Sequence, residues 1–178
     1  TDGSDLVEKF RVNWDGYVNA KAMPIATTEI SSTSGTSVTG TGAVVVSPSS
    51  LSVTKRNVGR SRFLYHIVLS SETDGAITNT NGFLRLEYKI SSLGHTSFTG
   101  TNKVITTSSM SDYAGGTGQN TYTLLFTPPD FSRGAGIEMR LVFSKSHAQS
   151  VYFNQQSLAQ QPSGSSNHAL GYVMEVPV

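Results

Sequence analysis

Alternation of apolar and polar residues is the clearest signal along the chain. In residues 83–90 every second residue is Leu, Tyr or Ile, and most of the residues between them are charged. The same period of two runs through residues 137–143 and 122–126. Because successive side chains of a β-strand point to opposite faces, each segment is predicted to be a strand with one buried face and one wet face.

Other segments extend this pattern to the whole chain. The apolar run at 63–69, which contains His66, predicts a central strand buried on both faces, with His66 a hydrogen-bonded core residue. Further strands are predicted at 43–46, 103–107, 151–154 and 172–176. Clusters of Ser, Thr, Gly and Asn predict loops at 31–42, 70–82, 108–120 and 157–167. Single helical turns are expected only at 5–10 and 157–161. Many short strands with frequent turns predict an all-β fold, an antiparallel β-sandwich or jelly roll.

The first 23 residues have a pattern of their own. Phe10, Val12 and Trp14 alternate with polar residues, the turn-forming dipeptide Asp15-Gly16 follows, and a second short apolar run comes after it. This order predicts a short N-terminal β-hairpin. An isolated hairpin is at best marginally stable in water, so we expect it to pack against the rest of the chain or against another copy.

Composition narrows the classes of partner. The chain has 178 residues, 13 Lys and Arg against 12 Asp and Glu, and no Cys. A net charge near zero argues against binding to nucleic acid or to an anionic membrane. Without Cys, stability has to come from packing or from oligomerisation. The sequence contains no apolar run long enough for a membrane span, and since it does not begin with Met we expect it to be part of a longer protein.

The N-terminal pattern resembles the connecting segments that precede the distal heads of phage tail fibres and baseplate receptor-binding proteins. The resemblance covers about 15 residues and is carried by Phe10, Val12, Asp15, Gly16, Val18 and Ala20. It implies that residues 1–23 are a stem or shoulder with trimer contacts and that residues 24–178 are a receptor-binding head. It also implies a homotrimer in the virion tail, extracellular in its action. Its partners would be a host cell-surface polysaccharide or glycan and, through the missing N-terminal part, other tail proteins.

Catalytic chemistry finds little support in the sequence. A glycosidase needs two closely spaced carboxylates, one of them protonated. Here Glu72 and Asp74 fall in a predicted loop, Glu87 and Glu138 fall on predicted wet faces, and Asp130 follows two prolines in a turn. The four histidines are far apart and form no metal-binding motif. We therefore predict a protein that is not an enzyme, with no cofactor and no metal.

Saccharide binding, by contrast, has candidate residues. Sugars are recognised by an aromatic ring against their CH surface and by amide, hydroxyl or carboxylate groups that bond their OH groups, commonly on loops. The two loops at 108–120 and 154–168 contain such groups. The predicted ligand-binding residues are Asp112, Tyr113, Gln119, Asn120, Gln155 and His168. Trp14, the single Trp, is expected to be buried in the stem rather than stacked on a sugar.

Three other functions fit parts of the same pattern. A viral capsid surface spike or jelly-roll coat domain shares the composition and differs in how it assembles. A bacterial carbohydrate-binding module would be monomeric and would accept the hairpin into its own sheet. A lytic enzyme of the tailspike type would need a carboxylate pair in a groove, for which Asp112, or Glu72 with Asp74, would be the candidates.

Overall fold

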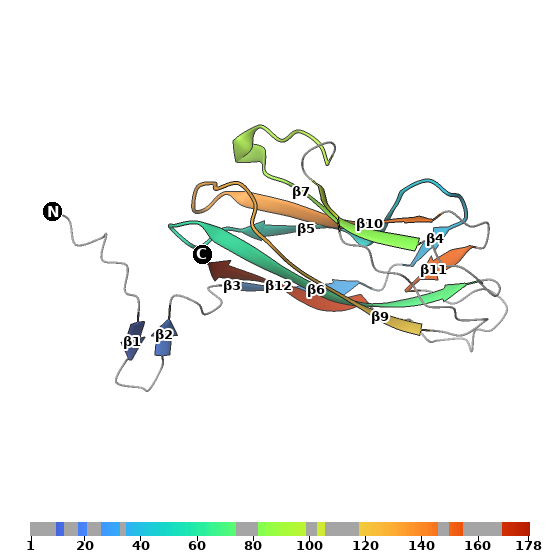
Figure 1. Cartoon of the computed structure of the whole chain (residues 1–178), viewed down its shortest axis with the longest axis horizontal. Helices are drawn as coiled ribbons and strands as arrows, with labels where there is room; N and C mark the ends of the chain where they lie inside the picture. Colours follow the sequence, from blue (N-terminus) through green and yellow to red (C-terminus); the bar gives the residue numbers. More distant parts are fainter. Residues whose placement is uncertain are drawn as a thin grey trace.

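The chain folds as a β-sandwich of two antiparallel sheets, which confirms the predicted all-β class (Figure 1). The computed structural model describes residues 10–12, 18–20, 26–32, 35–73, 82–98, 103–105, 118–145, 150–154 and 169–178. The helical content of these residues is a single 3-10 turn, η2, at Ser91–Leu93. No helix in the described part of the chain is long and apolar enough to cross a membrane.

The larger sheet is built around one long central strand, β6. Its order is β3-β12-β6-β11-β4, and β9 pairs with β6 as well. The strands are β3 Ala26–Ser32, β4 Thr36–Val38, β6 Ser61–Thr73, β9 Gly118–Phe126, β11 Val151–Phe153 and β12 Ala169–Pro177. All of the pairings are antiparallel. β6 pairs with three strands that follow it in the sequence, namely β9, β11 and β12.

The smaller sheet has the order β5-β10-β7-β8. Its strands are β5 Val44–Thr54, β7 Gly82–Lys89, β8 Lys103–Ile105 and β10 Gly136–Lys145. Strand β5 is an edge strand that contains Pro48, and its register against β10 shifts between Met139 and Leu141. Proline is tolerated in a sheet at an edge or a bulge, because no ladder hydrogen bond is then lost.

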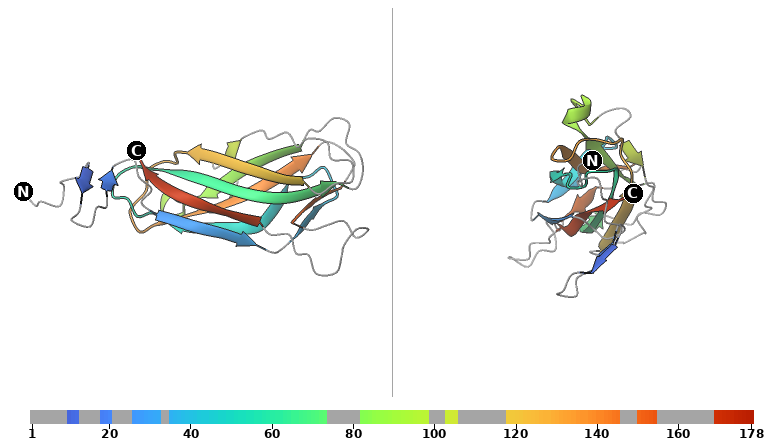
Figure 2. Two further views of the ribbon diagram at one scale, coloured as in Figure 1. Left: turned by 90° about the horizontal axis from the view of Figure 1, so that it is seen from below. Right: turned by 90° about the vertical axis from the view of Figure 1, so that its left-hand side faces the viewer.

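The N-terminal hairpin is a separate two-stranded sheet. β1, Phe10–Val12, pairs antiparallel with β2, Val18–Ala20, so the predicted strand, turn and strand are confirmed as far as the strands go. The turn residues and Trp14 lie outside the described residues. Figures 1 and 2 show the hairpin beyond one end of the sandwich rather than within either sheet.

The register gives the sandwich two distinct ends. At the hairpin end β3 begins at Ala26, opposite Glu175, and β6 begins at Ser61, opposite Pro177 near the end of β12 (Figure 2). At the far end β6 finishes at Thr73, opposite the start of β11 at Val151. The first strand of the sandwich, β3, therefore begins at the hairpin end, and its last strand, β12, ends there.

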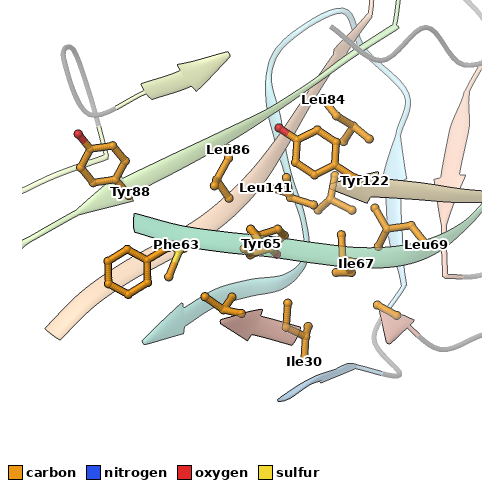
Figure 3. Packing of buried hydrophobic residues seen from close by; sticks show 14 of the residues in the cluster. Ile30, Phe63, Tyr65, Ile67, Leu69, Leu84, Leu86, Tyr88, Tyr122 and Leu141 are labelled. Carbon is orange, nitrogen blue, oxygen red and sulfur yellow. The ribbon is translucent and has the colours of Figure 1, made fainter. Parts of the chain in front are cut away.

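The core fills the space between the two sheets (Figure 3). Alternate residues of β6 meet alternate residues of β7 and β10 across this space, with aromatic rings between them. Rings of Phe143 and Phe153 meet edge to face at 5.0 Å, and those of Tyr88 and Phe126 stack at 5.5 Å. The largest fully buried side chains include Phe63, Tyr65, Ile67, Leu69, Leu84, Leu86, Ile137, Met139, Phe143 and Phe153. Burial of this apolar surface is the main stabilising contribution in a chain without disulfides.

Several predicted boundaries were wrong. Two strands, β3 and β4, lie within or beside the segment predicted as a loop at 31–42, because their Ser and Thr side chains suit a sheet whose outer face is wet. Strand β5 continues past residue 46 through its bulge. Strand β6 continues to Thr73 and β9 begins at Gly118, so both predicted loops that border them are shorter.

Candidate functional site

The ends of the two segments predicted to bind ligand lie together at the far end of the sandwich. Residues 106–117 connect β8 to β9, and residues 155–168 connect β11 to β12. Gly118, where β9 begins, and Phe153, where β11 ends, both pair with Ser71 of β6. Neighbouring strands are about 4.8 Å apart, so the two segments are anchored within about 10 Å of each other. The topology thus brings Gly118 and Phe153, which are 35 residues apart in the sequence, to the same end of the sandwich.

Of the six predicted ligand-binding residues, the structure describes two. Gln119 and Asn120 are residues of β9, paired with Ser70 and Leu69, and not loop residues as the sequence predicted. Their backbone groups are therefore held by β6, at the strand end nearest the connecting segment. The other four lie outside the described residues, and they are Asp112, Tyr113, Gln155 and His168.

Asn154 fixes the point at which the chain leaves β11. Its backbone φ is +54°, the left-handed region that Asn enters more readily than most residues, and its side chain is buried. Its backbone N–H donates to the carbonyl of Ser70 at 2.9 Å. Sequence patterns missed this role, although an Asn directly after a short apolar strand is a recognisable signal for a left-handed turn.

His66 is not the core residue that the sequence predicted. Burial along β6 alternates, so Phe63, Tyr65, Ile67 and Leu69 are buried while His66 is half-buried on the outer face. Its Nδ1 is hydrogen-bonded to Thr123 Oγ1 at 2.8 Å, and its ring stacks on Tyr172 at 4.8 Å. His66 therefore ties β6 to both β9 and β12 at the surface of the larger sheet.

The surface around His66 is mostly apolar. The outward-facing residues of β9, β6 and β12 form a patch that we call the β6–β12 face. It comprises Leu64, Val68, Leu125, Leu170, Tyr172 and Met174 around His66. Leu125 and Leu170 are 50% and 55% exposed, respectively, and are among the most exposed large apolar side chains described.

The outer face of the smaller sheet is charged instead, and its charges are paired. Glu87 was predicted to be solvated, yet it is buried, because Arg85 Nε donates to it at 2.9 Å and Arg140 donates through two nitrogens at 2.8 and 3.0 Å. The Phe98 ring lies 4.2 Å from the Arg140 guanidinium carbon. Glu138 pairs with Lys89 at 2.8 Å, so these carboxylates have structural roles.

At the hairpin end, two buried charged residues hold the connections between strands. Lys55 is 1% exposed, and its ammonium donates to Asp130 Oδ1 at 2.6 Å and to the Phe131 carbonyl. Glu175, fully buried, accepts from the backbone N–H groups of Arg56 and Asn57 and from the Ser61 hydroxyl. Asp130, predicted to be a turn residue, therefore serves as the partner of a buried cation.

The Lys55 and Asp130 pair leads to a prediction about acid stability. The hydrogen bond from Lys55 lowers the pKa of Asp130 below its usual value of 3.8. A carboxyl with a lowered folded-state pKa stabilises the fold fully above its unfolded pKa, and loses that contribution as the pH falls through the folded value. We expect Asp130→Asn to lower the urea midpoint at about pH 7, and the difference from wild type to shrink as the pH is lowered from about 4 toward about 2. An equal difference at about pH 7 and about pH 2 would contradict this assignment.

Two core tyrosines are held neutral. Burial raises the pKa of Tyr65, with a smaller contribution from Tyr122, and burial also raises the pKa of Tyr88. Neither phenol ionises in the physiological pH range, and both side chains are buried in the core. Within the described residues no group of three or more His, Cys, Asp or Glu side chains is placed to hold a metal ion.

Comparisons with known proteins assign no family. No protein-family model matches the sequence, and no curated protein matches it. A solved structure described as "Structure of infectious bursal disease virus Gx strain" is similar over 90% of this chain and 39% of that chain, with 11% sequence identity and a TM-score of 0.39. This chain thus spans well under half of its neighbour's length, and a likeness of this strength identifies neither a relative nor a function.

Proposed function

We propose that this chain is the non-catalytic host-binding head of a phage tail fibre or receptor-binding protein, and that it binds a cell-surface saccharide. One observation carries the proposal: the hairpin, the start of β3 and the end of β12 lie at the same end of the sandwich (Figure 2). A head carried on a stem needs this arrangement, because all attachment is then on one side and the opposite end is free to meet a cell surface. The resemblance of residues 1–23 to fibre stems supports the same orientation.

The segments whose ends are anchored at the far end contain the residue types that saccharide binding requires. Asp112, Tyr113 and Gln155 belong to segments anchored next to each other around Ser71, and they combine a ring with carboxylate and amide groups. Sites of this kind on β-sandwich loops bind weakly one at a time. A homotrimer would present three of them on one support and raise the avidity without any new contact.

The test is a glycan array probed with the full chain, followed by calorimetry with soluble fragments of the strongest host glycan. We expect binding that Tyr113→Ala or Gln155→Ala weakens by about tenfold or more, since loss of one stacking or hydrogen-bonding group costs on the order of 1.4 kcal/mol. Arg60→Ala, at the exposed hairpin end, is the matched control and is expected to leave binding unchanged. An array without binding, or equal loss in all three variants, would reject the proposal.

A structural subunit of a virus particle is the second candidate, favoured by the apolar β6–β12 face. A shell subunit has to bury such surfaces against its neighbours. Under this hypothesis the purified chain would assemble into closed particles or large rings and would bind no host glycan. A fibre head would instead give a small, defined oligomer that binds one.

A further inference from the structure

Apolar contact on the β6–β12 face is continuous from strand to strand. The register aligns Leu125 of β9, Leu64 of β6 and Met174 of β12 in one row across the sheet. Two positions farther along, Thr123, His66 and Tyr172 form a second row, joined by the hydrogen bond and the ring stack described above. Neighbouring strands are about 4.8 Å apart, so side chains within a row are near neighbours, and the two rows lie about 6.6 Å apart along the strands.

Polar residues border this patch on both sides. On β3 the outward side chains Thr27, Glu29 and Ser31 are exposed, and on β9 Thr121 is exposed. An apolar centre with a polar border is the usual anatomy of a protein interface. The outer face of the smaller sheet differs, since its charges are already paired with each other and partly covered by Phe98. The two outer faces of the sandwich are therefore suited to different surroundings.

We propose that the β6–β12 face binds a second copy of this chain, with the two hairpins at the same end; this rests on the proposed function, in which several heads share one stem. Charge is compatible with a self-contact. The face carries Glu29 on one side and Arg62 near the hairpin end, and neither forms an ion pair with another described residue.

The β6–β12 face alone is too small to hold two copies together, so the contact also needs the stem. Three strands at about 4.8 Å and a length of about seven residues at 3.3 Å give an area of roughly 330 Å². A stable pair of proteins buries about 800 Å² on each partner. The face alone supplies roughly two fifths of that area. The remainder has to come from neighbouring surfaces such as the hairpin, which has no partner sheet within the sandwich.

The test uses the full chain and light scattering coupled to size-exclusion chromatography over a range of concentrations. We expect the wild type to give a small multiple of 19.0 kDa, and Leu125→Asp with Leu170→Asp to give 19.0 kDa or at least a tenfold weaker association. Both side chains are exposed, so the double variant is expected to keep its melting temperature. Phe83→Asp is the matched control, because Phe83 is 42% exposed on the smaller sheet, and it should assemble like the wild type.

The outcomes separate this inference from the proposed function. A monomeric wild type, or a double variant with unchanged mass, would overturn the interface, whereas glycan binding would be unaffected by either result. The monomeric double variant should bind a soluble glycan fragment as tightly as the wild type and lose at least tenfold on a glycan-coated surface, where avidity matters. If the wild type assembles but binds no glycan, the interface stands and the function as a saccharide-binding head does not.

Discussion

Gly171→Ala is expected to destabilise the protein by at least about 3 kcal/mol, a large part of the roughly 5–15 kcal/mol by which a folded domain is usually stable, because overpacking against rigid backbone exceeds the usual 1–3 kcal/mol. Strand β12 runs so close to β6 at this point that a Cβ on Gly171 would lie 2.1 Å from the His66 carbonyl oxygen and 2.7 Å from the Ile67 Cα. Both atoms belong to the backbone of the central strand, so no side chain can rotate away to relieve the clash.

Gly136→Ala is the control for this prediction. Gly136 begins β10, and a Cβ there would meet the Ser52 hydroxyl at 3.6 Å, an ordinary contact. We expect its free energy of unfolding to stay within about 0.5 kcal/mol of wild type. Urea unfolding followed by circular dichroism measures both variants. A Gly171→Ala protein as stable as Gly136→Ala would mean that β12 and β6 are farther apart than described.

Glu175→Ala is expected to cost about 3–5 kcal/mol, the second large effect. Its carboxylate is fully buried and accepts from two backbone N–H groups at 2.7 and 3.0 Å and from the Ser61 hydroxyl at 2.6 Å. Removing it opens a cavity and leaves three donors without an acceptor, the Ser61 hydroxyl in a buried position and the two backbone N–H groups in part-buried ones. A buried donor left without a partner costs about 1–3 kcal/mol.

Glu175→Gln and Ser61→Ala are milder variants that separate the contributions to this loss of stability. The Gln side chain keeps the volume and one acceptor oxygen, so we expect about 1–2 kcal/mol, and Ser61→Ala removes one bond for about 1 kcal/mol. Chemical denaturation should show the largest loss of unfolding free energy in Glu175→Ala, a smaller loss in Glu175→Gln and the smallest in Ser61→Ala. If Glu175→Gln proved as damaging as Glu175→Ala, the negative charge itself would be the main contribution, and not the set of hydrogen bonds.

The sequence predicted most of the fold because strand periodicity is local. Alternation in residues 83–90 and 137–143 marked β7 and β10, and the apolar run at 63–69 marked the central strand. Strand β3 was missed because only Ile30 of it is an apolar residue of the core, so it has no alternation to detect. The local pattern also could not show that His66 faces outward, since Leu64 and Val68 beside it are apolar on a face that is partly exposed.

The candidate sites depend on pairings that no local pattern contains. Glu87 was predicted to be solvated because it alternates with Leu86 and Tyr88, and it is buried because Arg140, a residue of another strand, covers it. Glu175 and Lys55 likewise acquire partners more than 70 residues away in the sequence. The predicted ligand residues were chosen by composition alone, and the register adds only that their segments are anchored side by side.

The position of β12 also constrains how the chain folds. β12 lies between β3 and β6, so β3 has no partner in its sheet, and one edge of β6 is largely open, until residues 169–177 have been synthesised. Strand pairings between residues far apart in the sequence form slowly, and an open strand edge promotes aggregation until it is paired. Completion of the larger sheet therefore has to await the synthesis of β12, and the yield of folded protein depends on how long incomplete chains are kept apart.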